Sequence, residues 1–250
     1  EYMKHDASKS RYWACLALFA FAMSGGVLAG SFFMVFIFWE LVGFSSYLLI
    51  GFWHSKETAA RASQKAFVIN RIGDIGFVIA LMALWTFPEG FNQLNAEGIL
   101  DAGTPSWLLN LFGIGLATAV LSKSAQFPQQ IWLPDAMAGP TPVSSLLHAA
   151  TMVAAGVYLL LRAAPLLTLE VMVGLGFIGA ITALLAALSA LRQTDIKAVL
   201  AYSTISQLGF MLIGIGTGTT EYTYLHLIPH AYFKCGLFLT AGAVIHALHD

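Results

Sequence analysis

The sequence predicts an all-α membrane protein that crosses the bilayer several times. Hydrophobic residues make up 58% of its 250 residues and charged residues only 10%, whereas soluble domains carry about 25% charged residues. The apolar residues gather in long runs, and about 20 such residues in a helix cross the hydrocarbon core. The runs lack the alternation of barrel strands, and backbone polar groups in lipid must be bonded internally. The expected fold is therefore a polytopic helical membrane domain.

We expect eight membrane-spanning helices in a single domain without a soluble module. Their expected ranges are 12–29, 31–53, 64–87, 107–131, 143–164, 170–191, 197–216 and 223–248. The one long connection, 88–106, holds Glu89, Glu97 and Asp101 but no basic residue. Because the chain opens at Glu1 and stops within a helical pattern, we expect a fragment of a longer protein.

Basic residues predict the orientation of these helices. Eight of the twelve Lys and Arg residues fall at the same end of the expected spans, namely Lys4, Lys9, Arg11, Lys56, Arg61, Lys65, Arg192 and Lys197. Only Arg162 falls at the opposite end. The positive-inside rule then places both ends of the fragment on the cytoplasmic or matrix side. The remaining three basic residues, Arg71, Lys123 and Lys234, fall inside spans.

The composition also excludes several classes of function. A net charge of −1 provides no basic footprint for nucleic acid. Cys15 and Cys235 lie in separate apolar runs, so they form neither a disulfide framework nor a CxxC metal motif. No bound cofactor and no metal are expected in this chain.

The fourth span carries the pattern of a broken helix. Lys123 is followed by Pro128 and Pro134, and a proline within a span removes a backbone hydrogen bond and bends the helix. Discontinuous helices at mid-membrane recur in transporters, where freed backbone groups line an ion site. Kinked helices also occur for packing alone, so both interpretations stay open.

The charges inside the spans need partners, because each costs on the order of 2.5–3.5 kcal/mol near the bilayer centre. Arg71 and Asp74 are three residues apart on one helix face, where they can pair. Lys123 has no nearby counter-ion on its own helix, and we expect its partner to be Glu40 on the second span. These pairs either join helices or take part in transport. For Arg71 and Asp74 both interpretations stay open. For Glu40 and Lys123 a role in transport is favoured, because ionisable residues within a membrane usually mark functional sites.

Histidines form a second group of candidates. In the last span His226, His230 and Lys234 recur every four residues and share one helix face. Histidine titrates near neutral pH, which suits a proton relay. Two histidines with this spacing also bind zinc, but the HLIPH run lacks the glutamate of HExxH and a third ligand. His148 in the fifth span is a further relay candidate, with hydrogen-bonded packing as the alternative.

Six long motifs resemble the antiporter-like subunits of respiratory complex I, in particular the chain 5 (subunit L) type. The resemblance covers nearly the whole chain, from about Tyr12 onward. The motifs are FWELVGFSSYLLIGFW at 38–53, NRIGDIGF at 70–77, KSAQFP at 123–128, LPDAMAGPTPVSSLLHAATMVAAGVYLL at 133–160, DIKAVLAYSTISQLGFM at 195–211 and HAYFKCGLF at 230–238.

The resemblance implies two inverted five-helix repeats, each with a discontinuous helix. The first repeat would cover about 12–164, and 170–250 would begin the second. Motif positions imply a proton relay of Glu40, Lys123, His148 and Lys234. Arg71 and Asp74 would support it, and His226 and His230 are further relay candidates. Gln129, Gln130 and Ala138 depart from the family pattern and receive no role.

The resemblance implies proton translocation as a subunit of NADH:quinone oxidoreductase in an energy-converting membrane, the bacterial inner membrane or the mitochondrial inner membrane. Protons would enter at Lys123, pass His148 and reach Lys234. Flavin, iron–sulfur clusters and quinone are expected in partner subunits, which include paralogous antiporter-like subunits. The alternatives are the large subunit of a sodium/proton antiporter and a subunit of a membrane-bound hydrogenase-type complex.

Overall fold

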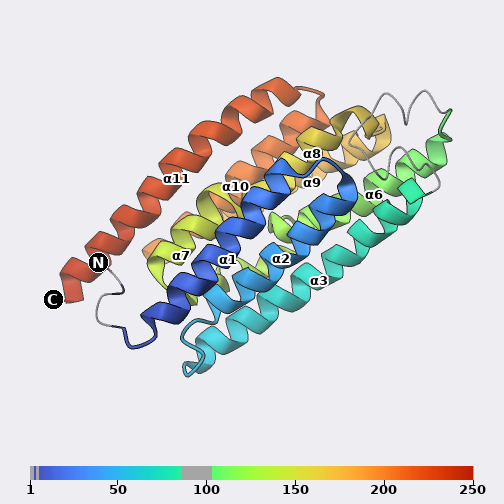
Figure 1. Ribbon diagram of the computed structural model, residues 1–250. Coiled ribbons are helices and arrows are strands. Elements are labelled where there is room, and N and C mark those ends of the chain that lie inside the picture. Colours follow the sequence, from blue (N-terminus) through green and yellow to red (C-terminus); the bar gives the residue numbers. More distant parts are fainter. Residues whose placement is uncertain (1–2, 4–5, 86–102, 250) are drawn as a thin grey trace.

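The computed structural model describes residue 3 and residues 6–85 and 103–249, and in these residues it contains helices and no strand. The helices run side by side (Figure 1). They are α1 (Lys9–Leu28), α2 (Phe32–Ile50), α3 (Glu57–Trp85), α6 (Ser106–Lys123), α7 (Thr141–Ser145), α8 (Met152–Ala163), α9 (Leu169–Ala190), α10 (Ile196–Gly216) and α11 (Thr220–His249). Short turns are η1 (Gln130–Trp132), η2 (Asp135–Ala138), η3 (Leu146–Ala150) and η4 (Ala164–Leu166).

Eight helical segments within the described residues are long and apolar enough to span a membrane, and each corresponds to one predicted span. The fifth is a composite, Thr141–Leu166, made of α7, η3, α8 and η4. The predicted connection with Glu89, Glu97 and Asp101 lies almost wholly outside the described residues. The predicted all-α polytopic fold is confirmed.

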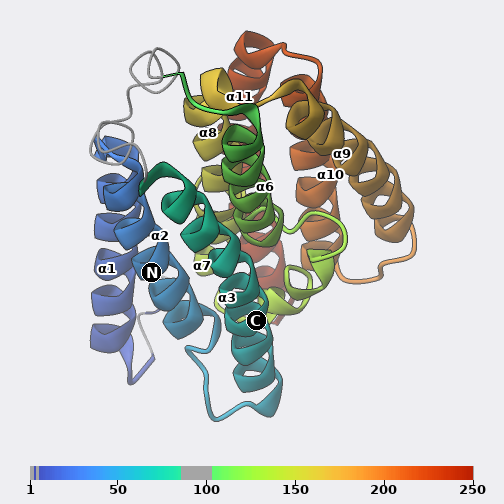
Figure 2. The ribbon, with the colours of Figure 1, turned by 90° about the vertical axis from the view of Figure 1, so that its right-hand side faces the viewer.

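The helices alternate in direction, so the basic residues gather at one end of the bundle. α1, α3 and α10 begin there, and α2, α9 and α11 end there, at the lower left of Figure 1. Figure 2 shows the same alternation from another side, with α1 and α9 at opposite edges. The side of the membrane that this end faces stays a prediction.

Glycines permit a close approach between α3 and α6 and between α9 and α10. A Cβ on Gly76 would lie 2.6 Å from the carbonyl oxygen of Gly115, and a Cβ on Gly179 would lie 2.6 Å from that of Gly209. Small residues let helix backbones approach each other closely. Within lipid, this van der Waals packing drives helix association, because the hydrophobic effect does not act between helices there. The α3–α6 contact fixes the site described below.

The fourth span is shorter than predicted, because its α-helix ends at Lys123 instead of near residue 131. Ala125 then adopts a positive φ of 50° and Pro128 follows, and both end the helical path. The chain continues through η1 and η2 to α7. The Gln126 side-chain nitrogen donates to the Ser124 carbonyl at 2.9 Å and to that of Ile205 at 3.3 Å. The predicted break is therefore present, and it falls at the lysine itself.

A second break, which the sequence pattern did not predict, lies in the fifth span. Residues Leu146–Ala150 form one π-helical turn between α7 and α8. Thr151 donates its hydroxyl to the carbonyl of Leu146 at 2.6 Å, which satisfies an acceptor that the wider turn leaves free. π-turns inside α-helices occur frequently at functional sites. This turn contains His148.

Candidate functional site

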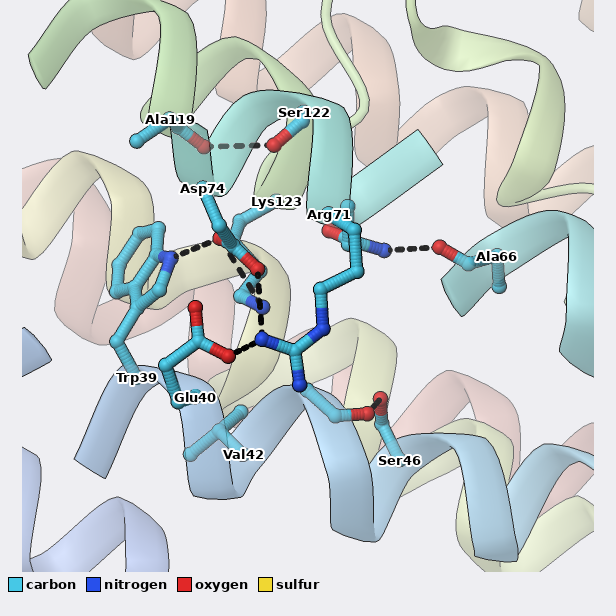
Figure 3. A network of polar contacts seen from close by, with 12 residues as sticks. Trp39, Glu40, Val42, Ser46, Ala66, Arg71, Asp74, Ala119, Ser122 and Lys123 are labelled. Carbon is cyan, nitrogen blue, oxygen red and sulfur yellow. Dashed lines mark hydrogen bonds and ion pairs between the residues drawn. The ribbon is translucent and has the colours of Figure 1, made fainter. Parts of the chain in front are cut away.

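Four charged side chains from three helices form a continuous ionic network (Figure 3). Glu40 of α2 forms an ion pair with Arg71 of α3. Arg71 Nη1 lies 4.0 Å from Asp74 Oδ2, and Asp74 Oδ1 lies 3.7 Å from Lys123 Nζ on α6. The predicted contact between Arg71 and Asp74 is thus present, at the limit of ion-pair distance. The two positive and two negative charges balance.

The predicted partner of Lys123 was wrong. We expected a direct pair with Glu40, but the structure pairs Glu40 with Arg71 and Lys123 with Asp74. The cause is the rotation of α2 about its axis. A Cβ on Gly43, one turn after Glu40, would lie 2.8 Å from Lys123 Nζ, so the lysine faces this glycine.

The tryptophan that precedes Glu40 joins both halves of the network. The Trp39 indole nitrogen donates to Asp74 Oδ1 at 2.7 Å, and Lys123 Nζ lies 5.4 Å from the centroid of the Trp39 ring. The face of the Trp39 ring attracts the Lys123 ammonium group. The indole N–H holds the Asp74 carboxylate, which is the counter-charge of that ammonium group. Trp39 had no role among the sequence expectations, although its position beside Glu40 in FWELVG was a usable signal.

Lys123 is almost completely buried, with 1% of its surface exposed. Its Nζ has no hydrogen-bond partner among the described residues, since Asp74 lies beyond hydrogen-bond distance. The ammonium group borders a cavity of about 140 Å³ between α1, α2, α8 and α11. The cavity is mainly apolar, and Thr151 contributes a hydroxyl-bearing side chain to its lining. The one counter-charge that an ion pair brings to this ammonium group in the described residues is Asp74.

The three polar residues of α11 share one face, as predicted, and α10 supplies hydrogen-bond partners for two of them. Lys234 Nζ donates to Ser203 Oγ at 2.7 Å. His226 Nε2 and Gln207 Oε1 are 2.9 Å apart. His230 lies next along the face, with its ring centroid 6.4 Å from that of His226. Its nitrogens have no hydrogen-bond partner in the part of the chain that the structure describes.

His148 lies between the two groups of charges. Its ring is fully buried and lies 6.5 Å from the ring of Trp132 and 6.0 Å from that of Phe238. The Trp132 indole nitrogen donates to the carbonyl of Ser122, the residue before Lys123. Phe238 follows Lys234 by one turn of α11. Neither nitrogen of His148 has a partner among the described residues, so the alternative of hydrogen-bonded packing has no support there.

Other sequence expectations concern metal and departures from the family pattern. The described residues contain no group of three His, Cys, Asp or Glu side chains that could hold a metal ion. The side-chain oxygens of Gln129 and Gln130 are buried without a hydrogen-bond partner among the described residues. Ala138 ends the short turn η2.

The family model for the transmembrane part of NADH:quinone oxidoreductases and Mrp antiporters matches residues 29–250. The chain belongs to this family. Two curated proteins are similar in sequence to this chain over nearly its whole length. Subunit 5 of an NAD(P)H-quinone oxidoreductase from Paulinella chromatophora is 47% identical over 100% of this chain and 38% of its own length. Chain 5 of the NAD(P)H-quinone oxidoreductase from Synechocystis is 48% identical over 99% of this chain and 37% of its own length.

Solved structures show the same fold. A chain of the Mrp complex from Dietzia superimposes with a TM-score of 0.87 at 36% identity, covering 94% of this chain and 26% of that chain. A chain of an archaeal membrane-bound sulfane sulfur reductase superimposes with a TM-score of 0.81 at 25% identity, covering 97% and 52%. The chain spans little more than a third of the length of the curated family members.

Proposed function

We propose that this chain is the proton-translocating part of a membrane subunit of an NAD(P)H:quinone oxidoreductase complex. The observation that carries the proposal is Lys123, a fully buried lysine at the end of a broken helix, 3.7 Å from its carboxylate partner. Flavin, iron–sulfur clusters and quinone would belong to partner subunits, among them paralogous antiporter-like subunits. This chain would move protons and transfer no electrons.

The relay would run from Lys123 through His148 to Lys234. The aromatic rings of Trp132 and Phe238 contact His148 from the directions of α6 and α11, so water rather than these rings would carry the proton across the gaps. His226 and His230 would extend the path along α11.

Competition for Asp74 would control Lys123. Asp74 lies between Arg71 and Lys123, and Glu40 binds Arg71 on its other side. A pair of charges 4 Å apart attracts with about 4 kcal/mol at an effective dielectric constant of about 20. Moving one charge across 100 mV costs about 2.3 kcal/mol. A shift of Arg71 from Glu40 toward Asp74 would weaken the hold on the lysine by an energy of this order and favour proton release.

The alternatives are the large subunit of a sodium/proton antiporter and a subunit of a hydrogenase-type complex. The Mrp and sulfane sulfur reductase matches show that the same fold serves other complexes. Identity of 47–48% to oxidoreductase subunits, against 36% to the Mrp chain, favours the oxidoreductase. The proposed location is an energy-converting membrane, because the curated family members come from cyanobacterial, chloroplast and chromatophore complexes.

Proton transport by the assembled complex tests the proposal. Sealed vesicles containing the full-length subunit would be energised with electron donor and quinone, and proton uptake per electron measured with a pH-sensitive dye. Lys123→Met is expected to abolish the uptake assigned to this subunit. Lys9→Met, at an exposed lysine, is the matched control and is expected to leave uptake unchanged. Full uptake per electron in assembled Lys123→Met complex would refute the relay.

Purification of the native complex separates the alternatives. An oxidoreductase is expected to copurify with flavin and iron–sulfur subunits that transfer electrons to quinone. A complex that lacks these subunits and exchanges sodium for protons would identify the chain as part of an antiporter and overturn the proposal.

A further inference from the structure

A second pocket, unrelated to the buried lysines, lies at the basic end of the bundle. Its volume is about 190 Å³, and it lies between the first turns of α1, the end of α2 and the start of α3. Arg11, His54, Ser63 and Gln64 give it a polar side, and Cys15 and Phe52 give it an apolar side. The lining is thus amphipathic, with a permanent positive charge.

The charge of Arg11 is not neutralised by an ion pair with any carboxylate in the described residues. Its Nη2 donates to the Phe52 carbonyl at 2.7 Å, its Nη1 lies 3.3 Å from His54 Nδ1, and its Cζ lies 4.8 Å from the Phe52 ring centroid. These contacts orient the guanidinium group and leave further N–H donors for a ligand. Arg61 at the same end is already paired with Glu57 at 2.5 Å.

The carboxylate of Asp6, whose charge interacts with that of Arg11, is held by other groups. Asp6 accepts hydrogen bonds from the Ser8 amide at 2.7 Å and from the Trp53 indole at 3.2 Å. These two bonds, with a smaller contribution from the charge of Arg11, lower the pKa of the Asp6 carboxyl below its usual value. Asp6 does not line the pocket, so an incoming anion would not compete with it for the guanidinium N–H groups.

Tryptophans place the pocket at the depth of lipid headgroups. Trp13 follows Arg11 by two residues and is 58% exposed. Trp53 lies at the end of the pocket's α2 wall, with Lys56 Nζ 4.7 Å from its ring centroid. Tryptophan is enriched at the membrane–water interface, and basic pockets between helices at this level bind anionic headgroups. The pocket therefore lies at the level of lipid headgroups, and its polar and apolar sides match the charged and apolar ends of a lipid.

We propose that this pocket binds the phosphodiester headgroup of an anionic phospholipid such as phosphatidylglycerol. Arginine forms paired hydrogen bonds to two phosphate oxygens. The Ser63 and Gln64 side chains line the polar side, and Cys15 and Phe52 lie where the glycerol and the first acyl carbons would enter. A single anionic phosphate complements Arg11, the arginine that lines this pocket.

Alkylation of Cys15 measures occupancy directly, because this thiol lines the pocket. The full complex, purified in neutral detergent, would be treated with a maleimide while phosphatidylglycerol is titrated, and modification of Cys15 read by peptide mass spectrometry. Phosphatidylglycerol is expected to slow the modification, and phosphatidylcholine and inorganic phosphate are not. Equal protection by phosphatidylcholine, equal protection by inorganic phosphate, or no protection by phosphatidylglycerol would each overturn the proposal.

Two variants locate the effect at the pocket. Each basic residue near a membrane surface contributes about 1 kcal/mol to the binding of anionic lipid, so Arg11→Gln is expected to require about fivefold more phosphatidylglycerol for half protection. Arg61→Gln removes the same charge outside the pocket and is the matched control. Gln64→Glu adds a negative charge at an exposed lining position and is expected to weaken binding even if Arg11→Gln does not fold. An unchanged titration in both Arg11→Gln and Gln64→Glu would refute the site.

Discussion

Three different contacts hold the charge of Lys123 inside the protein. Asp74 supplies an opposite charge at 3.7 Å, Trp39 supplies a ring face, and Gly43 supplies the space for the ammonium group. None of them is a full hydrogen bond, so the lysine is positioned without being locked. The proposed relay requires this lysine to lose its proton.

Replacing this lysine with arginine separates charge from proton transfer. Lys123→Arg keeps the positive charge, but arginine does not release its proton in proteins. It is therefore expected to reduce proton pumping about as severely as Lys123→Met, by a factor of about 100 or more. Pumping would be compared at equal amounts of assembled complex. Full activity with arginine would make the residue an electrostatic anchor.

The ionic network predicts an order of severity among carboxylate variants. Asp74→Asn leaves Lys123 without its direct counter-charge, whereas Glu40→Gln acts on Lys123 only through Arg71. Asp74→Asn is therefore expected to lower pumping more than Glu40→Gln, and both are expected to assemble. Proton uptake per electron in the two variants provides the comparison. The reverse order would favour a direct role of Glu40 at Lys123.

The indole N–H of Trp39 is expected to matter apart from its ring. Trp39→Phe keeps an aromatic face near Lys123 but removes the donor to Asp74. A hydrogen bond to a charged group contributes about 1.5–3 kcal/mol, so activity is expected to fall about tenfold or more. Trp132→Phe, which removes a donor to a neutral carbonyl, is the comparison and is expected to be milder. An equal loss of activity in Trp39→Phe and Trp132→Phe would show that the hydrogen bond from Trp39 to Asp74 has no special role.

At the scale of elements, the contact between α3 and α6 brings Asp74 to Lys123. A Cβ on Gly115 would lie 2.5 Å from the carbonyl oxygen of Gly76, which belongs to the backbone and cannot rotate away. Gly115→Ala is expected to separate these helices and to destabilise the protein by about 1–3 kcal/mol. Gly174→Ala, where a Cβ meets nothing within 4 Å, is the control. Thermal unfolding and the amount of assembled complex measure the difference.

Sequence patterns located the helices well and their rotation poorly. Hydropathy fixed the eight spans, because each must cover the same hydrocarbon thickness. The Glu40–Lys123 pairing was wrong because burial cost identifies which charges need partners but not which faces of two helices meet. The π-turn at Leu146–Ala150 had no sequence signal, since its LLHAA residues suit an ordinary helix equally well.

The polar run YSTISQ on the seventh span indicates polar contacts within the membrane but not their partners. Hydroxyl and amide side chains within a span either hold water or bond neighbouring helices. The structure shows the second for Ser203 and Gln207, which contact Lys234 and His226. The earlier residue of α10, Ser203, contacts the later residue of α11, Lys234. The order is reversed because α10 and α11 run in opposite directions.

At the scale of the whole molecule, the orientation in the membrane is the main testable prediction. The positive-inside rule places the basic end in the cytoplasm or its topological equivalent. Ser55→Cys at the basic end and Leu169→Cys at the opposite end are both at exposed positions. A membrane-impermeant thiol reagent added from the cytoplasmic side is expected to label the first and not the second. The opposite labelling would invert the proposed direction of transport.

The end of α6 at Lys123 has a further consequence for the charge balance of the site. The last carbonyl groups of a helix carry a partial negative charge of about half an elementary charge, which stabilises a cation there by roughly 0.3–2 kcal/mol. Lys123 occupies the last turn of α6. It therefore has two counter-charges of different kinds. The helix macrodipole is permanent and moves with the lysine, while Asp74 is shared with Arg71. In the proposed mechanism only Asp74 would therefore act as the switch.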